Sequence, residues 1–492
     1  MQSINKNYRA FTIALLLFMV INWEGCKKLV TVDPPVTGVN SQNVYNTDAT
    51  AVAALTGIYA NMVVSSNSLA AGAQSISTFC GLSADEFTLY SGVSATSNSS
   101  LYYKNQLAVN SSPSAGGEFW GGIYGTPLYS CNAAIEGLNA STTLTPAVKQ
   151  QLLGEAKFMR AFFYFYLANL YGDVPLVISS NYATNASLPR TPKAQVYAQI
   201  IQDLKDAQGL LADGYIKADG QSLYANGSEQ RLRPCKSAAT ALLARVYLYT
   251  GSNYADAITQ ASAVISNSSY YSLPALNSVF LANSKEAIWQ LQPVVTGHNT
   301  EDGWLYVLPS TGPSTSYPVY LSPQLLGSFE AGDLRKVNGN WVNTVTSGGV
   351  TYYYPYKYKS ATLNAAVTEY TMVLRLGEQY LIRAEAEAQL NQLSASILDL
   401  NVIRTRAGLP GTTATTQAAL LTAIQHERQV ELFSEWGHRW LDLKRTGTVD
   451  AVMGAVTLAK GNSSGWNTQQ QLYPLPLGDI QKDPALVQNP GY

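Results

Sequence analysis

Charged side chains are scarce in this sequence. Asp, Glu, Lys and Arg make up 13% of the 492 residues, about half the share that is usual in soluble proteins, and the formal net charge is −1. Neither a basic stretch suited to nucleic acid nor an acidic tail is present, so we expect no nucleic-acid partner. Uncharged polar residues take the place of the missing charges, and Tyr, with 32 copies, far outnumbers Phe, with 12.

Cysteine and histidine are also rare, with four and three copies. Apart from Cys26 near the N-terminus, the cysteines are widely spaced, at Cys80, Cys131 and Cys235. An odd number of distant cysteines predicts no disulfide framework, and either one bridge with a free thiol or three unpaired buried thiols would fit. No CxxC pair, HExxH, P-loop or dinucleotide motif occurs, so we expect no metal, no cofactor and no enzymatic activity.

The N-terminus predicts export. An apolar run over residues 10–21 follows two basic residues; at about twelve residues it is too short to span a bilayer and is typical of a secretory signal. We therefore predict a signal peptide at 1–25 with lipidation of Cys26, because Gly25 and Cys26 resemble a bacterial lipoprotein cleavage site. A plain cleaved signal with an unmodified cysteine is the alternative. Residues 27–46, marked by Pro and Gly, would then form an extended tether.

Helical periodicity dominates two parts of the chain, residues 119–265 and 378–445. In both parts, apolar residues at helical spacing and small residues where helices would cross resemble tetratricopeptide repeats. The run 152–171 is apolar almost all round, which predicts a buried central helix. Residues 65–117 and 266–371 show no helical period, and we predict that they form long loop-rich insertions.

These patterns predict a mainly α fold, in which irregular tetratricopeptide-like helical pairs form a scaffold with long loop-rich insertions and minor β structure. One domain would span residues 47–492, beginning with a helix at 47–62. Within the second insertion, the segment 287–290 predicts a short strand.

The stretch 427–447 combines acidic, basic and aromatic residues on a helical pattern that Gly437 interrupts. A glycine inside a helix costs roughly 1 kcal/mol relative to alanine, so we expect a break or a close packing contact there. Three glutamates share one helical face and predict ion pairs instead of a catalytic carboxylate pair: Glu427, Glu431 and Glu435. We expect their partners among neighbouring arginines such as Arg428 and Arg439.

The same stretch resembles the SusD/RagB family of nutrient-binding outer-membrane lipoproteins. The sequence pattern of that family falls here on Glu427, Arg428, Glu431, Glu435, Gly437, Arg439, Asp442, Leu443, Arg445 and Gly447. Further similar segments are EAKFMRAFFYFYLANLYGDVPLV at 155–177, the helical pairs at 236–265 and 378–408, and the closing sequence up to Tyr492. The resemblance therefore covers nearly the whole chain after the leader.

The resemblance implies a cell-surface lipoprotein of the outer membrane, held by its lipid anchor, that binds oligosaccharide and catalyses no reaction. It also implies a partner, a TonB-dependent transporter of the SusC type, to which the glycan is delivered. Two alternatives stay open. One is a peptide-binding, RagB-like member of the same fold. The other is a glycoside hydrolase, which the small number of carboxylates in the insertions disfavours.

Candidate ligand-binding residues come from the two insertions, because binding residues collect on loops held by a rigid scaffold. An aromatic ring can cover the C–H face of a sugar while its polar edge bonds hydroxyls. Trp304 is the first choice, since Gly303 and polar residues flank it. The other candidates are aromatic or polar side chains of the same insertions: Tyr306, Tyr317, Tyr320, Tyr90, Tyr102, Tyr103, Asp85, Asp302 and Asn299. Aromatic residues that merely pack the loops are the alternative.

Overall fold

The computed structural model describes residues 43–64, 69–109 and 115–492. Residues 45–492 form one compact unit. The predicted signal peptide, Cys26, most of the predicted tether and two short parts of the first insertion lie outside the described residues. Of the helices in the described part of the chain, none combines the length and the apolar character that a membrane crossing requires.

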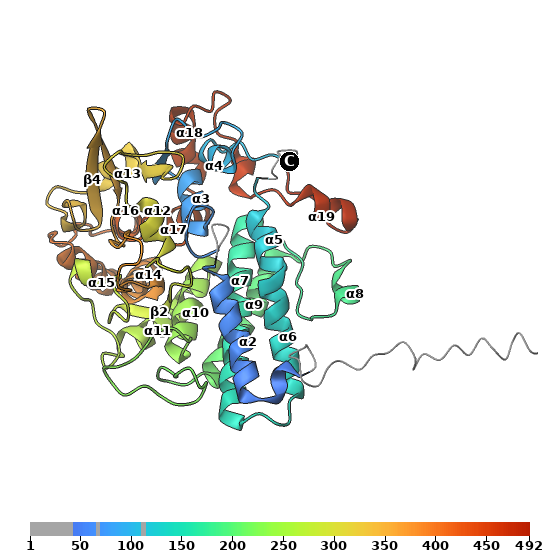
Figure 1. The fold of residues 1–492 in the computed structure, drawn as a ribbon. Helices are drawn as coiled ribbons and strands as arrows, with labels where there is room; N and C mark the ends of the chain where they lie inside the picture. The colour runs from blue at the N-terminus through green and yellow to red at the C-terminus, as the bar shows by residue number, and fades with distance from the viewer. Residues whose placement is uncertain (1–42, 65–68, 110–114) are drawn as a thin grey trace, which may run out of the picture. The chain divides into compact units, whose positions relative to one another are not determined.

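The fold is mainly α-helical, as predicted (Figure 1). In chain order the first elements are α2 (Asp48–Asn61), α3 (Ile76–Ser83), β1 (Phe87–Leu89), α4 (Asn98–Tyr103), α5 (Glu118–Tyr124), α6 (Thr126–Ala140), α7 (Pro146–Tyr171), α8 (Tyr182–Asn185), α9 (Lys193–Leu210), α10 (Lys236–Thr250) and α11 (Tyr254–Ile265). The others are β2 (Ala287–Leu291), α12 (Glu301–Tyr306), β3 (Val319–Leu321), α13 (Pro323–Ser328), β4 (Val342–Ser347), β5 (Val350–Pro355), β6 (Thr371–Arg375), α14 (Leu376–Gln389), α15 (Leu393–Arg406), α16 (Gln417–Glu431), α17 (His438–Arg445), α18 (Val449–Ala459) and α19 (Leu477–Lys482).

Helical pairs form the scaffold. Helix α10 packs against α11, α14 against α15, and α11 against α14, so that consecutive pairs are in contact. Gly251 separates the first pair in the left-handed conformation, which glycine adopts without steric cost. Helix α9, which lies within the predicted helical part 119–265, packs along the central helix α7.

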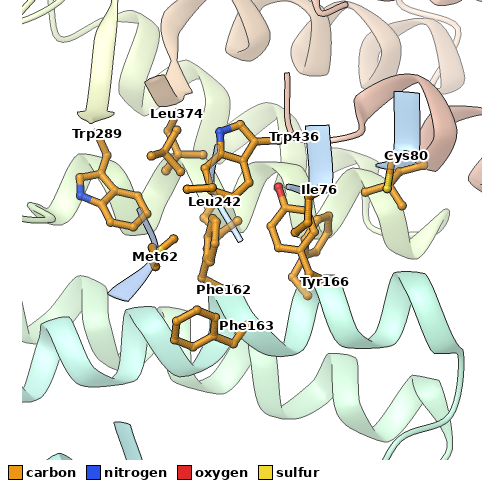
Figure 2. Packing of buried hydrophobic residues seen from close by; sticks show 14 of the residues in the cluster. Met62, Ile76, Cys80, Phe162, Phe163, Tyr166, Leu242, Trp289, Leu374 and Trp436 are labelled. Atoms are coloured by element: carbon orange, nitrogen blue, oxygen red, sulfur yellow. The ribbon is translucent and has the colours of Figure 1, made fainter. Parts of the chain in front are cut away.

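The core is centred on α7, whose second half is buried on every side, as predicted. Phe162 lies between two indoles, with its ring centroid 5.6 Å from that of Trp289 and 5.3 Å from that of Trp436. Both contacts are edge to face, the arrangement that ring quadrupoles favour. Figure 2 shows these rings together with Tyr166, Leu374 and Cys80, residues contributed by segments far apart in the chain.

The helix break predicted at Gly437 is confirmed. Helix α16 ends at Glu431 and α17 begins at His438, and Gly437 has a φ of 68°. A Cβ on Gly437 would lie 2.7 Å from the Cβ of Cys80, so this glycine also makes the close contact that was its other expected role. Cys80, Cys131 and Cys235 are free, buried thiols, which resolves the alternative left open by their spacing.

A buried ion network surrounds the end of α16. Three arginines from other segments converge on the carboxylate of Glu431: Arg335 at 2.8 Å, Arg375 at 2.7 Å and Arg406. Glu427 joins through Arg335 at 2.6 Å, and Glu435 through Arg375 at 2.8 Å. The predicted ion pairs of these glutamates are therefore confirmed.

The predicted partners of the glutamates were wrong. Arg428 binds Asp442 at 2.7 Å, and Arg439 binds Asp85 at 2.7 Å. The helix ends at Glu431, so Arg439 belongs to the next helix and follows a different axis. Local spacing within one helix therefore could not identify these pairs.

The two insertions are more ordered than predicted. The first contains α3, β1 and α4, and the second contains α12, α13 and β2 to β5 and ends where β6 begins. Helix α3, with the sequence ISTFCGLS, is buried all round, so it has no polar face that would give a helical period. The strand predicted at 287–290 is confirmed as β2, which pairs with β6 in an antiparallel sheet.

Candidate functional site

Strands β1 and β3 join the two insertions. They pair antiparallel, with Phe87 opposite Leu321, Thr88 opposite Tyr320, and Leu89 opposite Val319. Because side chains alternate along a strand, the first and last pairs point into the core and are buried. Thr88 and Tyr320 point to the opposite face and are half-buried. This pairing brings residues about 230 positions apart in the chain side by side.

Two further tyrosines extend this face. The ring of Tyr352, on β5, lies edge-on to that of Tyr320, with centroids 5.2 Å apart and an interplanar angle of 81°. Tyr103, at the end of α4, lies close to the Thr88 side chain, and burial, together with nearby Tyr320, raises the pKa of Tyr103. All three rings are half-buried. We call Tyr103, Tyr320 and Tyr352, with Thr88 between them, the tyrosine face.

Tyr90 and Tyr317 lie at the margin of the tyrosine face. The backbone N–H of Tyr90 donates to the carbonyl of Pro318 at 2.7 Å, which continues the β1–β3 pairing by one residue. Tyr90 therefore lies two positions beyond Thr88 on the same side of the strand. Both tyrosines are half-buried. Of the predicted ligand-binding residues, the fold thus gathers four at this place: Tyr90, Tyr103, Tyr317 and Tyr320.

Lys460 lies beneath the tyrosine face. Its ammonium is 5.0 Å from the ring centroid of Tyr103, in a cation–π contact, and donates to the carbonyl of Leu82 at 2.6 Å. Burial lowers the pKa of Lys460 to about 7, against the opposing effect of Asp85 and Glu86. The contact fixes the ring of Tyr103 from one side.

Trp304 has a different setting from the one predicted. It belongs to helix α12, and its indole stacks on His298 with ring centroids 4.1 Å apart and an interplanar angle of 16°. His298 is held in turn by Glu301, at 2.6 Å from Nδ1. Trp304 is half-buried, so part of its surface faces solvent. The side chain is therefore a preoriented ring on a short helix, outside the tyrosine face.

Burial removes five predicted residues from the candidate ligand contacts. Their side chains are at most 4% exposed and serve the fold: Tyr102, Tyr306, Asp85, Asp302 and Asn299. The hydroxyl of Tyr102 donates to Glu118 at 2.7 Å, and that of Tyr306 is 2.8 Å from the hydroxyl of Thr78. Asp85 binds Arg439, while Asp302 accepts from the backbone of Gly72 at 3.0 Å. Asn299 accepts from the backbone of Thr368 at 2.7 Å. Loops that carry this many polar groups need internal partners, and these side chains supply them.

Tyr352 was missed as a candidate. The run of tyrosines at 352–354 could have indicated it. Side chains alternate between the two faces of a strand, so at least one ring of this run must lie on the exposed face. The hairpin of β4 and β5, with Val345 opposite Tyr352, holds this ring in place.

The tyrosine face contains no carboxylate or imidazole that could act as an acid or base. Within the described residues, no group of three or more His, Cys, Asp or Glu side chains could hold a metal ion. The segment GNSSG at 461–465 has the spacing of a serine-hydrolase elbow. It follows helix α18 directly, whereas that elbow joins a strand to a helix. The arrangement suits stacking and hydrogen bonding.

Comparisons with known proteins agree on one family. A family model described as "SusD family" matches residues 329–492, and one described as "Starch-binding associating with outer membrane" matches residues 47–248. SusD-like protein P2 of Formosa agariphila is 26% identical over 559 aligned residues, which cover 99% of this chain and 100% of the relative.

Solved structures share the fold. A SusD superfamily protein from Bacteroides vulgatus superposes with a TM-score of 0.74 at 21% identity, covering 90% of this chain and 99% of the other. A laminarin-binding SusD-like protein gives a TM-score of 0.70 at 23% identity, with coverage of 90% and 99%. Surface glycan-binding protein A from Bacteroides uniformis gives 0.73 at 19% identity, with coverage of 90% and 98%. The two family models, which together match most of the chain, and the relative of similar length establish that this chain belongs to the SusD/RagB family.

Proposed function

We propose that the protein captures oligosaccharide at the cell surface through the tyrosine face and delivers it, unmodified, to a TonB-dependent outer-membrane transporter of the SusC type. The observation that carries the proposal is the β1–β3 pairing, which places half-buried rings from both insertions on one face. Rigid strands fix the rings before any ligand arrives, which limits the entropy lost on binding.

The chemistry of the face fits a sugar. A pyranose ring offers a face of C–H groups bordered by hydroxyls, and a phenol offers an apolar ring with one polar tip. Tyr320 and Tyr352 meet at 81°, so a bound chain can contact the face of one ring and the edge of the other. The hydroxyls of the tyrosines and of Thr88 can bond the rim of the sugar. Two proteins of the same fold are described as laminarin-binding and surface glycan-binding, which supports this ligand class.

The location and the partner rest on the N-terminus and on the family. One matching family model is described as associating with the outer membrane. A lipid on Cys26 would anchor the chain there, and the 27–46 segment would give the folded unit reach above the membrane. A protein that binds glycan beside the membrane without cleaving it needs a transporter to receive the cargo.

A binding screen with product analysis tests the proposal. The full chain, purified in detergent, is titrated calorimetrically with β-1,3-glucan, α-1,4-glucan and β-1,4-xylan hexasaccharides, and with unstructured peptides of similar mass. We expect saturable binding of at least one oligosaccharide and no new reducing ends after prolonged incubation. Release of reducing ends would make the protein a glycoside hydrolase, and binding of peptides alone would make it a peptide-capture protein; either result overturns the proposal.

A further inference from the structure

A second concave surface lies beside helix α8 and shares no lining residue with the tyrosine face. It encloses a cavity of about 440 Å³ lined by α5, α6, the loop that carries α8, and α19. The residues that matter for the argument are Tyr124, Tyr129, Ser180, Tyr182, Asn185 and Asp479. We call this surface the α8 groove. In Figure 1, α8 and α19 lie on one side of the ribbon, whereas β4 and α13 lie on the other.

The loop that forms one wall of the groove is firmly anchored. A β-bridge between Val174 and Thr191 closes its base. The hydroxyl of Tyr164 bonds both the N–H of Val177, at 2.6 Å, and its carbonyl, at 2.9 Å. Asn132 donates to the same carbonyl at 2.9 Å. A compact surface loop whose ends are joined and whose backbone is bonded to the scaffold holds its side chains in fixed positions, as recognition loops often do.

Two tyrosines project from this fixed frame into solvent. Tyr182 is 84% exposed and Tyr129 is 51% exposed. Folding therefore buries little of the Tyr182 ring, so packing in this unit does not explain why an aromatic residue stands there. Large rings on a rigid frame are effective contact surfaces, because few rotatable bonds are frozen when a ligand binds.

Polar groups border the rings. Asp479 accepts from the indole N–H of Trp120 at 3.1 Å through Oδ2, while Oδ1 accepts no hydrogen bond from the described residues. Asn185 donates from Nδ2 to the carbonyl of Ser179 at 2.7 Å, which orients its Oδ1. Asp479 is the only Asp, Glu, Lys, Arg or His among the described residues that line the groove. The groove thus combines rings with carboxylate, amide and hydroxyl groups and has little charge.

We propose that the α8 groove is a second oligosaccharide-binding site, in which Tyr129 and Tyr182 contact sugar faces and Asp479 and Asn185 bond sugar hydroxyls. The ligand class rests on the proposed function, but the site is independent of the tyrosine face. The volume lies in the range of small-ligand sites, roughly 300 to 1,000 Å³. A protein partner would instead need a contact surface of about 800 Å² and about 20–30 residues on each side. Ten residues line the groove, a size that favours a small ligand such as an oligosaccharide.

Two sites on one chain would let the protein hold a polysaccharide at separate points. Once a polysaccharide is bound at one site, its binding at the other site is intramolecular. A polysaccharide long enough to reach both sites therefore binds more tightly than a hexasaccharide, although each site makes the same contacts.

The test compares double variants of the full chain in detergent against the three hexasaccharides named above. Tyr129→Ala/Tyr182→Ala removes both rings of the groove, and Tyr129→Phe/Tyr182→Phe keeps them as a matched control. Tyr320→Ala/Tyr352→Ala disables the tyrosine face. Because Tyr129 and Tyr182 are exposed, thermal unfolding of the groove variants should match that of the unchanged chain, which confirms that they fold.

The tyrosine-face variant should keep measurable binding of at least one hexasaccharide. Adding Tyr129→Ala/Tyr182→Ala to that variant should weaken the remaining binding at least tenfold. Adding Tyr129→Phe/Tyr182→Phe instead should weaken it less than threefold. The second site does not exist if the tyrosine-face variant loses all binding of hexasaccharide. The same conclusion follows if the groove substitutions leave the affinity of the tyrosine-face variant unchanged. In both cases the proposed function stands. If the unchanged chain binds no hexasaccharide, both proposals fail. If only the groove variant loses binding, the groove stands and the tyrosine face fails. A groove variant with normal sugar binding that no longer copurifies with a transporter would make the groove a protein contact and overturn the inference.

Discussion

Tyr320 on β3 meets Tyr352 on β5 edge to face, with ring centroids 5.2 Å apart. The two rings belong to separate strand pairs, β1–β3 and β4–β5, and the contact joins these pairs. Each ring therefore restrains the other before a ligand binds. The tyrosine face therefore depends on both strand pairs at once.

Replacing Trp304 tests whether helix α12 contributes to oligosaccharide binding in addition to the tyrosine face. The indole is held by its stack on His298 and is only partly buried, so it is available to a second part of a glycan chain. Trp304→Ala should weaken oligosaccharide binding by about fivefold, equivalent to about 1 kcal/mol, with thermal unfolding unchanged. Trp304→Phe, which keeps a ring, should lose less. Unchanged affinity in the alanine variant would exclude α12 from the site.

Glu431 should be the most costly carboxylate to neutralise. Burial raises its pKa, but Arg406, Arg375, Arg335 and Lys357 outweigh that effect and hold the pKa well below its ordinary value. Glu431→Gln leaves buried arginines without a counter-charge and should lower the free energy of unfolding by about 3–5 kcal/mol in urea titrations at pH 7.

Glu330→Gln is the matched control for Glu431→Gln. Glu330 pairs with Arg404 at 2.6 Å, but its side chain is 38% exposed, so its loss should cost less than about 1 kcal/mol. If both variants lose the same free energy of unfolding, the buried ion network does not stabilise the fold more than the exposed ion pair does.

Asp302 should destabilise the folded chain as the pH rises. Burial raises its pKa from 3.8 to about 7, although the Gly72 N–H opposes the shift. Between pH about 4 and about 7 the folded chain then holds this proton more tightly than the unfolded chain does, so the free energy of unfolding falls across that window. Asp302→Asn keeps an acceptor for Gly72 and removes the titration.

The variant Asp302→Asn should therefore be more stable than the unchanged chain at pH 8, by up to about 4 kcal/mol, and should differ little at pH 4. Urea unfolding at pH 4, 6 and 8 measures this difference. Buried acids that do not interact with Asp302 titrate alike in both proteins, so their contributions cancel in the difference. A difference that stays constant with pH would contradict the raised pKa.

Gly437 should tolerate no side chain. Alanine there would need a left-handed backbone, at a φ of 68°, and its Cβ would lie 2.7 Å from that of Cys80. Strain and overpacking together should cost about 2–4 kcal/mol of unfolding free energy. Gly454→Ala is the control: it lies in helix α18 with no neighbour within 4 Å, and alanine there should stabilise by about 0.5–1 kcal/mol. A neutral Gly437→Ala would mean that α17 can shift away from α3.

The helical scaffold was predictable because its signals are local. The apolar run at 152–171 and the Gly437 break each depend on residues within one or two turns, and both are present in the structure. The partners of Glu427 and Glu431 were not predictable, since Arg335 lies 92 positions from Glu427 in the chain and meets it only through the tertiary fold.

The candidate site was predictable only in outline. Tyr102 and Tyr103 are neighbours in the same insertion, yet Tyr102 is fully buried against Glu118, whereas Tyr103 lies beside Thr88 and is only partly buried. Which of the two faces solvent depends on how α4 packs on β1, a contact that no local pattern encodes. The pairing of Thr88 with Tyr320, which gathers the rings, is equally remote in sequence.

The central claim is that the tyrosine face binds oligosaccharide, and one calorimetric comparison tests it most directly. The unchanged chain, Tyr320→Ala/Tyr352→Ala and Tyr320→Phe/Tyr352→Phe are titrated with the hexasaccharide that binds best in the screen, with Tyr254→Ala, a half-buried tyrosine of α11, as a control. We predict that the alanine pair weakens binding at least tenfold, about 1.4 kcal/mol, while the phenylalanine pair and the control stay within threefold. Equal affinity of the alanine pair and the unchanged chain, with both proteins folded, would contradict the account.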